Sequence, residues 1–272
     1  MPHVYDIPLA YATRNALRRV GVEVIPARID SNLLAMHLDR LFSTLRVSCV
    51  LDVGARVGEY ALWLRNNGYR GNIISFEPVA ANFRELEKAA ARDSNWHCFN
   101  YALGADDSVS PINVSNHTEY SSFRQVNATA QERLGEETHT QRSETVEIQR
   151  LHSVLPRLPV KAADRIYLKM DTQGWDLEVL KGAQGALGQV IALQTEVAVQ
   201  PIYDEMPVMQ ESIAAIADYG FIPSGFFPVH LDVQMAAIEF DFVAVRGAAI
   251  RDPREAEGQP ASERSDGGSS PS

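Results

Sequence analysis

The sequence is poor in the features that mark secreted, membrane-spanning or nucleic-acid-binding proteins. Its two cysteines, Cys49 and Cys98, fall in different predicted strands without paired spacing, so we expect no disulfide framework and a reduced intracellular protein. The N-terminus lacks a basic start followed by an unbroken apolar run, and no apolar run reaches the roughly 18 residues that a membrane span needs. These absences predict a cytoplasmic protein with no membrane span.

Positive charge is also in the minority. The chain has 25 Lys and Arg against 35 Asp and Glu, a net charge of -10, and no dense basic stripe. Sequence-independent electrostatic binding to nucleic-acid phosphates is therefore not expected, and neither is a nucleic-acid partner. Whether the protein forms a homo-oligomer stays open.

The chain is long and apolar enough for one sizeable core. It has 272 residues, of which 45% are hydrophobic, so it should fold without metal or disulfide support. We expect an N-terminal helical cap over residues 1–47 and a single domain over 48–248. From Arg251 the sequence has no aromatic or branched aliphatic residue, which predicts a disordered tail over 249–272.

From Val50 onward, short apolar runs alternate with helical periodicity. This alternation predicts an α/β fold with a mostly parallel sheet covered on both faces. Two runs near the C-terminus, 221–227 and 237–247, are typical of an antiparallel hairpin at the sheet edge. A polar loop is expected from about 105 to 140, between strands at 108–115 and 144–151. Strands are predicted at 47–54, 72–78, 96–104, 165–171 and 190–197, and helices at 59–68, 79–93, 175–187 and 209–219.

The first predicted strand ends on a glycine-containing turn. In a doubly wound sheet ligands bind beyond the carboxyl ends of the strands, and Gly54 and Gly58 would let the backbone approach a ligand closely. The spacing Asp-x-Gly-x-x-x-Gly lacks the third glycine of a dinucleotide fingerprint, and tight packing alone is the alternative. Glu77 ends the second strand, where a carboxylate can bind a ribose diol or be only a solvated acid. With Asp52, the set favours a nucleoside ligand.

Four motifs together resemble the FkbM-type methyltransferases: "VLDVGARVGEY", "SFEP", "ALG" at 102–104 and above all "LKMDTQGWDLEVLKGA" at 168–183. The resemblance implies a Rossmann-like class I methyltransferase fold that uses S-adenosylmethionine to methylate oxygen. It also implies that Asp171 faces the reaction centre. The family often has Glu where Gln173 stands, so this chain has an uncharged side chain at that position. The implied cofactor-binding residues are Asp52, Gly54, Arg56, Gly58, Glu77, Pro78, Ala102, Leu103 and Asp171, with Arg56 able to clash or pair with the cofactor carboxylate.

Methyl transfer to oxygen asks for an aligned hydroxyl and a group that takes its proton. Candidates are Asp171 and Glu196 at adjacent strand ends, and His117 or His139 on the polar loop. Asp171 could instead only cap the following helix, and Glu196 only a loop. No His lies at ligand spacing beside either acid, so we expect no metal. Lys169 is expected to pair with an acid, in the site or structurally.

The polar loop "NVSNHTEYSSFRQVN" interleaves Tyr120 and Phe123 with many donors and acceptors, which suits a sugar as well as it suits a bland surface loop. Trp175 is expected either to pack in the core or to provide a flat surface on which a sugar ring stacks. The sequence thus predicts an O-methyltransferase acting on a hydroxyl of a sugar or glycosylated secondary metabolite, with a small-molecule or glycoside acceptor as its partner. The alternatives are a non-catalytic nucleoside-binding or scaffolding module and, less favoured without the third glycine, a dinucleotide-dependent oxidoreductase.

Overall fold

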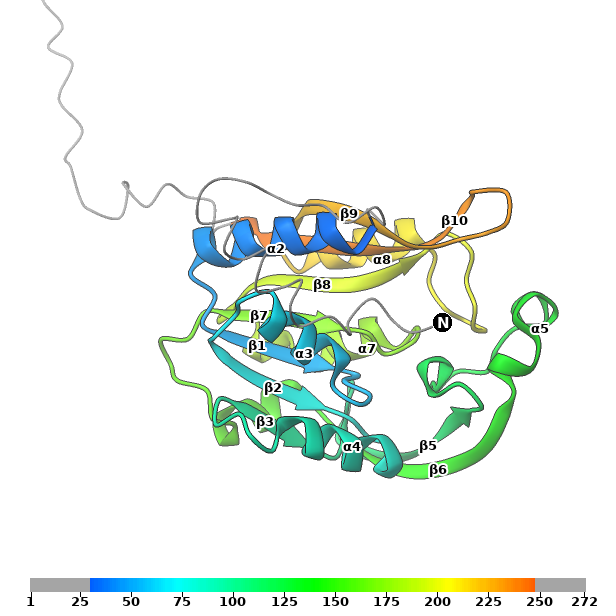
Figure 1. Ribbon diagram of the computed structural model, residues 1–272, viewed down its shortest axis with the longest axis horizontal. Coiled ribbons are helices and arrows are strands. Elements are labelled where there is room, and N and C mark those ends of the chain that lie inside the picture. Colours follow the sequence, from blue (N-terminus) through cyan, green and yellow to red (C-terminus); the bar gives the residue numbers. More distant parts are fainter. Residues whose placement is uncertain (1–29, 248–272) are drawn as a thin grey trace, which may run out of the picture.

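A computed structural model describes residues 30–247, which are built around one twisted seven-stranded sheet (Figure 1). The strand order is β3-β2-β1-β7-β8-β10-β9. The first five of these strands are mutually parallel, β10 runs antiparallel to β8, and β9 pairs antiparallel with β10 at the edge. The bounds are β1 Cys49–Val53, β2 Asn72–Phe76, β3 Trp96–Phe99, β7 Ile166–Met170, β8 Val190–Ala198, β9 Phe221–Leu231 and β10 Ala237–Arg246. The predicted mostly parallel α/β sheet with an antiparallel edge hairpin is confirmed.

Helices cover both faces of this sheet (Figure 1). Alternate residues of β1 point to opposite faces. Leu51 belongs to the same hydrophobic cluster as Val179 on one face, and Val50 to the same cluster as Trp63 on the other. Because both faces are buried, the central strands are mostly apolar and lack a regular alternation of polar and apolar residues, with Asp52, Ser75 and Lys169 as buried polar exceptions. One face packs against α2 Asp30–Leu45, α3 Glu59–Asn66 and α4 Ala80–Ala90, and the other against α6 Leu151–Val154, α7 Asp176–Gly182 and α8 Met209–Asp218.

A three-stranded sheet of order β4-β6-β5 extends from the main one. Its antiparallel pair, β5 Ser108–Ser115 and β6 Thr140–Gln149, confirms the two strands predicted around the polar loop. The single strand predicted over 96–104 is wrong, because the chain turns at Asn100, whose Nδ2 donates to the Glu77 carbonyl oxygen at 2.8 Å. The next residues form β4 Ala102–Leu103, which pairs with β6.

The stretch predicted as one long loop contains a short helix, α5 Ala128–Leu134, between two 3-10 turns, Thr118–Tyr120 and Gly135–Thr138. Asn127 begins the helix by accepting a hydrogen bond from the backbone N–H of Ala130 at 2.9 Å. The polar sequence therefore builds an ordered wall, with the Thr118–Tyr120 turn on its inner side.

Helix α2 is the described part of the predicted helical cap over 1–47, and it packs across β9 through His37, whose ring lies 5.2 Å from that of Phe227. The cap's first 29 residues and the tail predicted over 249–272 lie outside the described residues, so the domain boundaries stay predictions. Within the described part of the chain, no helix combines the length and apolar character needed to cross a membrane.

Candidate active site

A cavity of about 530 Å³ opens at the carboxyl ends of β1, β2, β7 and β8, where a parallel α/β sheet places its ligands. This volume lies within the range of roughly 300–1,000 Å³ that is usual for small-molecule and cofactor sites. The polar wall from Thr118 to Phe123 and the β9–β10 hairpin close its sides. Eight of the residues predicted for the site line it, namely Gly54, Arg56, Glu77, Pro78, Ala102, Leu103, Asp171 and Glu196.

The turn after β1 brings three strand ends together. Gly54 has a φ of 80°, and a Cβ at this position would overlap the carbonyl oxygen of Asp171 at the end of β7. The backbone N–H groups of Gly54 and Ala55 both donate to the Phe76 carbonyl oxygen at 3.0 Å, which ties the turn to the end of β2. The absence of a side chain at 54 therefore lets the backbone of the turn lie directly beside the cavity.

The Glu77 carboxylate is held at the cavity wall by backbone groups. Oε2 accepts from the N–H of Arg56, and Oε1 from the N–H of Val79, both at 2.9 Å, while Asn82 Nδ2 lies farther away at 3.4 Å. Burial raises the pKa of Glu77 to about 7, against the effect of these hydrogen bonds. A carboxylate has about four acceptor positions, so Glu77 keeps capacity for a ligand hydroxyl.

Asp52 does not line the cavity, which corrects its assignment to the cofactor. It faces the α3 side of the sheet, fully buried, beside its parallel-strand partner Lys169. Its Oδ1 lies 3.3 Å from Lys169 Nζ, and its Oδ2 accepts from Ser75 Oγ at 3.2 Å. Asp52 therefore acts on the site through Lys169.

Gly58 is also not part of the cavity lining. It has a φ of 93°, and a Cβ here would lie 2.9 Å from the ring of Trp96 and 3.0 Å from a methyl of Leu86. The alternative given by the sequence, tight packing, explains this glycine.

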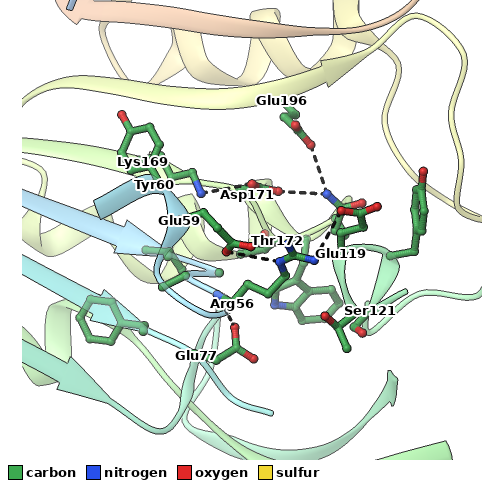
Figure 2. A pocket seen from close by; sticks show the side chains of 18 of the residues that line it. Arg56, Glu59, Tyr60, Glu77, Glu119, Ser121, Lys169, Asp171, Thr172 and Glu196 are labelled. Atoms are coloured by element: carbon green, nitrogen blue, oxygen red, sulfur yellow. Dashed lines mark hydrogen bonds and ion pairs between the residues drawn. The ribbon is translucent and has the colours of Figure 1, made fainter. Parts of the chain in front are cut away.

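Lys169 is a buried cation that organises the floor of the cavity. Its Nζ lies 3.1 Å from Asp171 Oδ2 and 4.9 Å from the centre of the Tyr60 ring, which confirms the expected pairing with an acid (Figure 2). Burial lowers the pKa of Lys169, but Asp171 and Asp52 outweigh this and raise it. Burial likewise opposes ionisation of Asp171, yet Lys169 and a hydrogen bond from Gln173 hold the pKa of Asp171 below its ordinary value.

Gln173 joins the two acids that were predicted at adjacent strand ends. Its Nε2 donates to Asp171 Oδ1 at 3.0 Å and to Glu196 Oε2 at 3.2 Å, and its Oε1 accepts from the hydroxyl of Tyr203 at 2.9 Å. Burial and the nearby charge of Asp171 raise the pKa of Glu196 well above its ordinary value. The environment therefore shifts the two pKa values in opposite directions, that of Asp171 downward and that of Glu196 upward.

Asp171 does not cap the helix that follows it. The turn from Thr172 to Asp176, which leads into α7, is stabilised by the Asp176 side chain. Its Oδ1 accepts from Thr172 N at 3.0 Å and from Thr172 Oγ1 at 2.7 Å. The Asp171 side chain points to Lys169 and Gln173 instead, so the helix-cap alternative is excluded.

The two loop histidines lie away from the cavity lining. His117 has an exposed side chain 3.9 Å from Glu119, and the exposed side chain of His139 lies 3.5 Å from Glu136. The 3-10 turn that starts at Thr118 directs the following residues inward and leaves His117 outside. The assignment of His117 to the reaction centre is corrected accordingly.

Arg56 spans the mouth of the site. Its guanidinium pairs with Glu59 at the start of α3 and lies 3.4 Å from Glu119 on the opposite wall (Figure 2). The backbone at Arg56 is left-handed, with a φ of 48°. The Arg56 side chain lines the cavity together with both of its acidic partners.

Sequence reasoning missed the contribution of the edge hairpin. Glu239 and Asp241 on β10 and His230 on β9 line the cavity. Asp241 Oδ1 accepts from Gln194 Nε2 at 2.6 Å, and burial raises its pKa to about 6. The signal was present in "AIEFDFVAV", because two acids spaced by two residues in an apolar strand share one face.

A family model described as the methyltransferase FkbM domain matches residues 52–223. The chain belongs to the FkbM methyltransferase family. The family uses S-adenosylmethionine, and the sheet described above is the Rossmann-like arrangement expected of it. The match covers the turn after β1, Glu77, Asp171 and Glu196 but ends before most of the β9–β10 hairpin. A search of curated proteins gave no match.

Several solved structures are similar to this FkbM methyltransferase at low sequence identity. Fibrillarin from Aeropyrum pernix, in complex with S-adenosylmethionine, is 14% identical over 73% of this chain and 66% of its own, with a TM-score of 0.43. Magnesium protoporphyrin IX methyltransferase from Synechocystis, with bound S-adenosylmethionine, is 11% identical over 86% and 95%, with a TM-score of 0.41. A TehB-like methyltransferase from Corynebacterium glutamicum is 10% identical over 88% and 97%, with a TM-score of 0.40.

The cavity of this family member has groups that suit the ribose of S-adenosylmethionine. Glu77 keeps acceptor capacity for the ribose, and Gly54 leaves open backbone beside it. The indole Nε1 of Trp175 lies beside Gly104, is buried and has no hydrogen-bond partner among the described residues. An unpaired buried donor at this position suits a ligand that supplies an acceptor atom. Within residues 30–247 no group of His, Cys, Asp and Glu is arranged to hold a metal.

Proposed function

We propose that the protein is an S-adenosylmethionine-dependent O-methyltransferase that acts on a hydroxyl of a sugar or a glycosylated secondary metabolite. The observation that carries the proposal is a single cavity whose two halves are lined by different kinds of chemical group. The Gly54 turn and Glu77 suit the cofactor, and the Asp171–Gln173–Glu196 arrangement beside them offers hydrogen-bonding groups of opposite character.

S-adenosylmethionine supplies an activated methyl group, so the task of the chain is alignment. In the proposed reaction Asp171 and Glu196 orient the acceptor by hydrogen bonds to its hydroxyls. Lys169 and Gln173 fix these side chains in advance. Alignment of this kind can lower a barrier by about 7–11 kcal/mol at best.

The acceptor half supports a hydroxyl-rich acceptor. Its walls combine the aromatic rings of Tyr120, Phe123 and Trp175 with carboxylate and amide groups, as sugar sites need apolar faces together with directed polar contacts. We also propose a cytoplasmic location for the reaction, which the free thiols of Cys49 and Cys98 support.

Two measurements on the purified protein test this function. Calorimetry should detect binding of S-adenosylhomocysteine and no binding of NAD, and a panel of glycosides incubated with labelled S-adenosylmethionine should include at least one that becomes labelled. Binding of NAD in place of S-adenosylhomocysteine would favour the oxidoreductase. Tight binding without transfer to any acceptor would favour the non-catalytic module.

A further inference from the structure

The edge hairpin adds a histidine and a buried acid to the acceptor half of the cavity. His230 on β9 and Glu239 on β10 are directly opposed across the two strands, and His230 Nδ1 lies 3.5 Å from Glu239 Oε2. The Glu239 side chain is only 4% exposed, whereas that of His230 is 59% exposed. The Glu239 carboxylate is therefore buried against the sheet, whereas the His230 imidazole is accessible at the cavity lining.

The pair continues a row of polar side chains that begins at the reaction centre. Glu196 on β8 is the cross-strand partner of Asp241 on β10, and Glu239 lies two residues from Asp241 on the same face. The row thus runs across the sheet from Glu196 through β10 to His230. All four of these side chains line the same cavity.

The acids nearest the reaction centre are already engaged by neighbouring side chains. Both oxygens of Asp171 are engaged, by Lys169 at 3.1 Å and by Gln173 at 3.0 Å, and these contacts keep its pKa low. Glu196 Oε2 accepts from Gln173 Nε2 at 3.2 Å, and burial together with the charge of Asp171 raises the pKa of Glu196. His230 Nε2, by contrast, has no hydrogen bond to any other described residue.

We propose that His230 is the general base of the methyl transfer and that Glu239 positions it. The inference rests on the O-methyltransferase function proposed above. A lone pair of the acceptor oxygen forms the new bond to the methyl carbon, the carbon–sulfur bond breaks with its electrons remaining on sulfur, and the hydroxyl proton passes to His230 Nε2. Glu239 stabilises the resulting imidazolium through Nδ1–H.

The charges around His230 agree with this role. Its hydrogen bond to Glu239 raises the pKa of His230, burial opposes the rise, and the charges of Glu239, Glu119 and Asp171 add to it. A histidine whose pKa is raised from its ordinary value of about 6.5 is well matched to proton transfer near neutral pH. These charges come from β10, from the opposite wall and from the residue that follows β7.

Substitution of the two residues tests the proposal. His230→Gln should lower kcat by about 10²–10⁴-fold while leaving S-adenosylhomocysteine affinity and Tm near their wild-type values. The matched control is His139→Gln, since that exposed histidine lies away from the cavity and its loss should leave kcat unchanged. His230→Asn serves as a second variant and should behave as His230→Gln does.

A pH profile separates positioning from simple support of the fold. In the wild type, kcat should fall toward acid pH as His230 becomes protonated, and Glu239→Gln should move this limb to lower pH because it removes the group that raises the pKa of His230. The His230 imidazole proton resonance, followed by NMR, should shift its titration in the same direction without any acceptor present.

The outcomes distinguish this inference from the function on which it rests. A wild-type enzyme that methylates an acceptor, combined with a His230→Gln variant of near-normal kcat, would overturn the role of His230 alone. The same titration in the wild type and in Glu239→Gln would overturn the role of Glu239. A wild type that methylates nothing would overturn the proposed function and the base assignment with it.

Discussion

The backbone N–H of Arg56 lies 2.9 Å from Oε2 of Glu77 and donates a hydrogen bond to it. This contact joins the turn after β1 to the end of β2, and it fixes the carboxylate by main-chain geometry. A side-chain contact could relax when the cavity fills, but a backbone contact of this kind holds Glu77 in place before any ligand arrives. The cofactor half of the site is therefore preorganised.

Glu77→Ala should weaken binding of S-adenosylhomocysteine and leave the fold intact. A charge-assisted hydrogen bond contributes roughly 1.5–3 kcal/mol, so the dissociation constant should rise by about 10–100-fold. Calorimetry measures this directly. Glu85→Gln, at an exposed acid that pairs only with Lys88 in the described structure, is the control and should bind as the wild type does. An unchanged dissociation constant in Glu77→Ala would remove Glu77 from the site.

Burial of Glu77 makes stability depend on pH in a defined direction. Its pKa is raised from 4.5 to about 7 in the folded state, so between these values the folded protein keeps a proton that the unfolded chain has released. Its contribution to the unfolding free energy is fully present below pH 4.5 and is lost as pH rises through about 7. The Tm of Glu77→Gln relative to the wild type should therefore increase from about pH 5 to about pH 8. A relative decrease would contradict the burial argument.

Asp171→Asn should reduce turnover by about 10²-fold or more with little change in cofactor affinity, because an amide keeps the size of the side chain but loses the ionised acceptor. Glu196→Gln should reduce turnover as well. Since Gln173 bonds both acids, the double variant should lose little beyond the larger single effect. Losses that simply multiply would show that the two carboxyl groups act independently.

The sheet and half of the site could be predicted because they follow from local patterns. Alternating apolar runs and helical periods specify a parallel sheet, and the ends of its strands specify where Glu77, Asp171 and Glu196 meet. Asp52 could not be placed in this way. Both faces of β1 are buried, so its sequence has no polar alternation to indicate on which side residue 52 lies.

The remaining site residues depend on contacts that are distant in sequence. His230 meets Glu239 only through the register of the β9–β10 hairpin, and the pairing shifts on both sides of Glu239, which a simple count from the turn would not foresee. His117 lies in an irregular segment, and the 3-10 turn Thr118–Tyr120 that follows it decides which side chains of this segment face the cavity. The break at Asn100 depends in turn on the Glu77 carbonyl oxygen of a neighbouring strand end.

Gly54→Ala should destabilise the protein and weaken cofactor binding together. The positive φ costs roughly 1–3 kcal/mol for a residue with a Cβ, and overlap with the Asp171 carbonyl oxygen adds to this cost. Gly68→Ala is the matched control, since Gly68 also has a positive φ but no atom within 4 Å of the added Cβ. Thermal unfolding should show the larger loss for Gly54→Ala. Equal losses in the two variants would mean that the close approach to β7 is unimportant.

The most direct test of the proposed function is to identify the atom that receives the methyl group. The enzyme is incubated with S-adenosylmethionine carrying a ¹³C-labelled methyl group and with the glycoside panel, and the products are analysed by NMR together with those of Asp171→Asn. The account predicts a new ¹³C methyl resonance of an O-methyl ether, formed with S-adenosylhomocysteine and strongly reduced in Asp171→Asn. Label found only on nitrogen or carbon, or transfer that Asp171→Asn leaves unchanged, would contradict it.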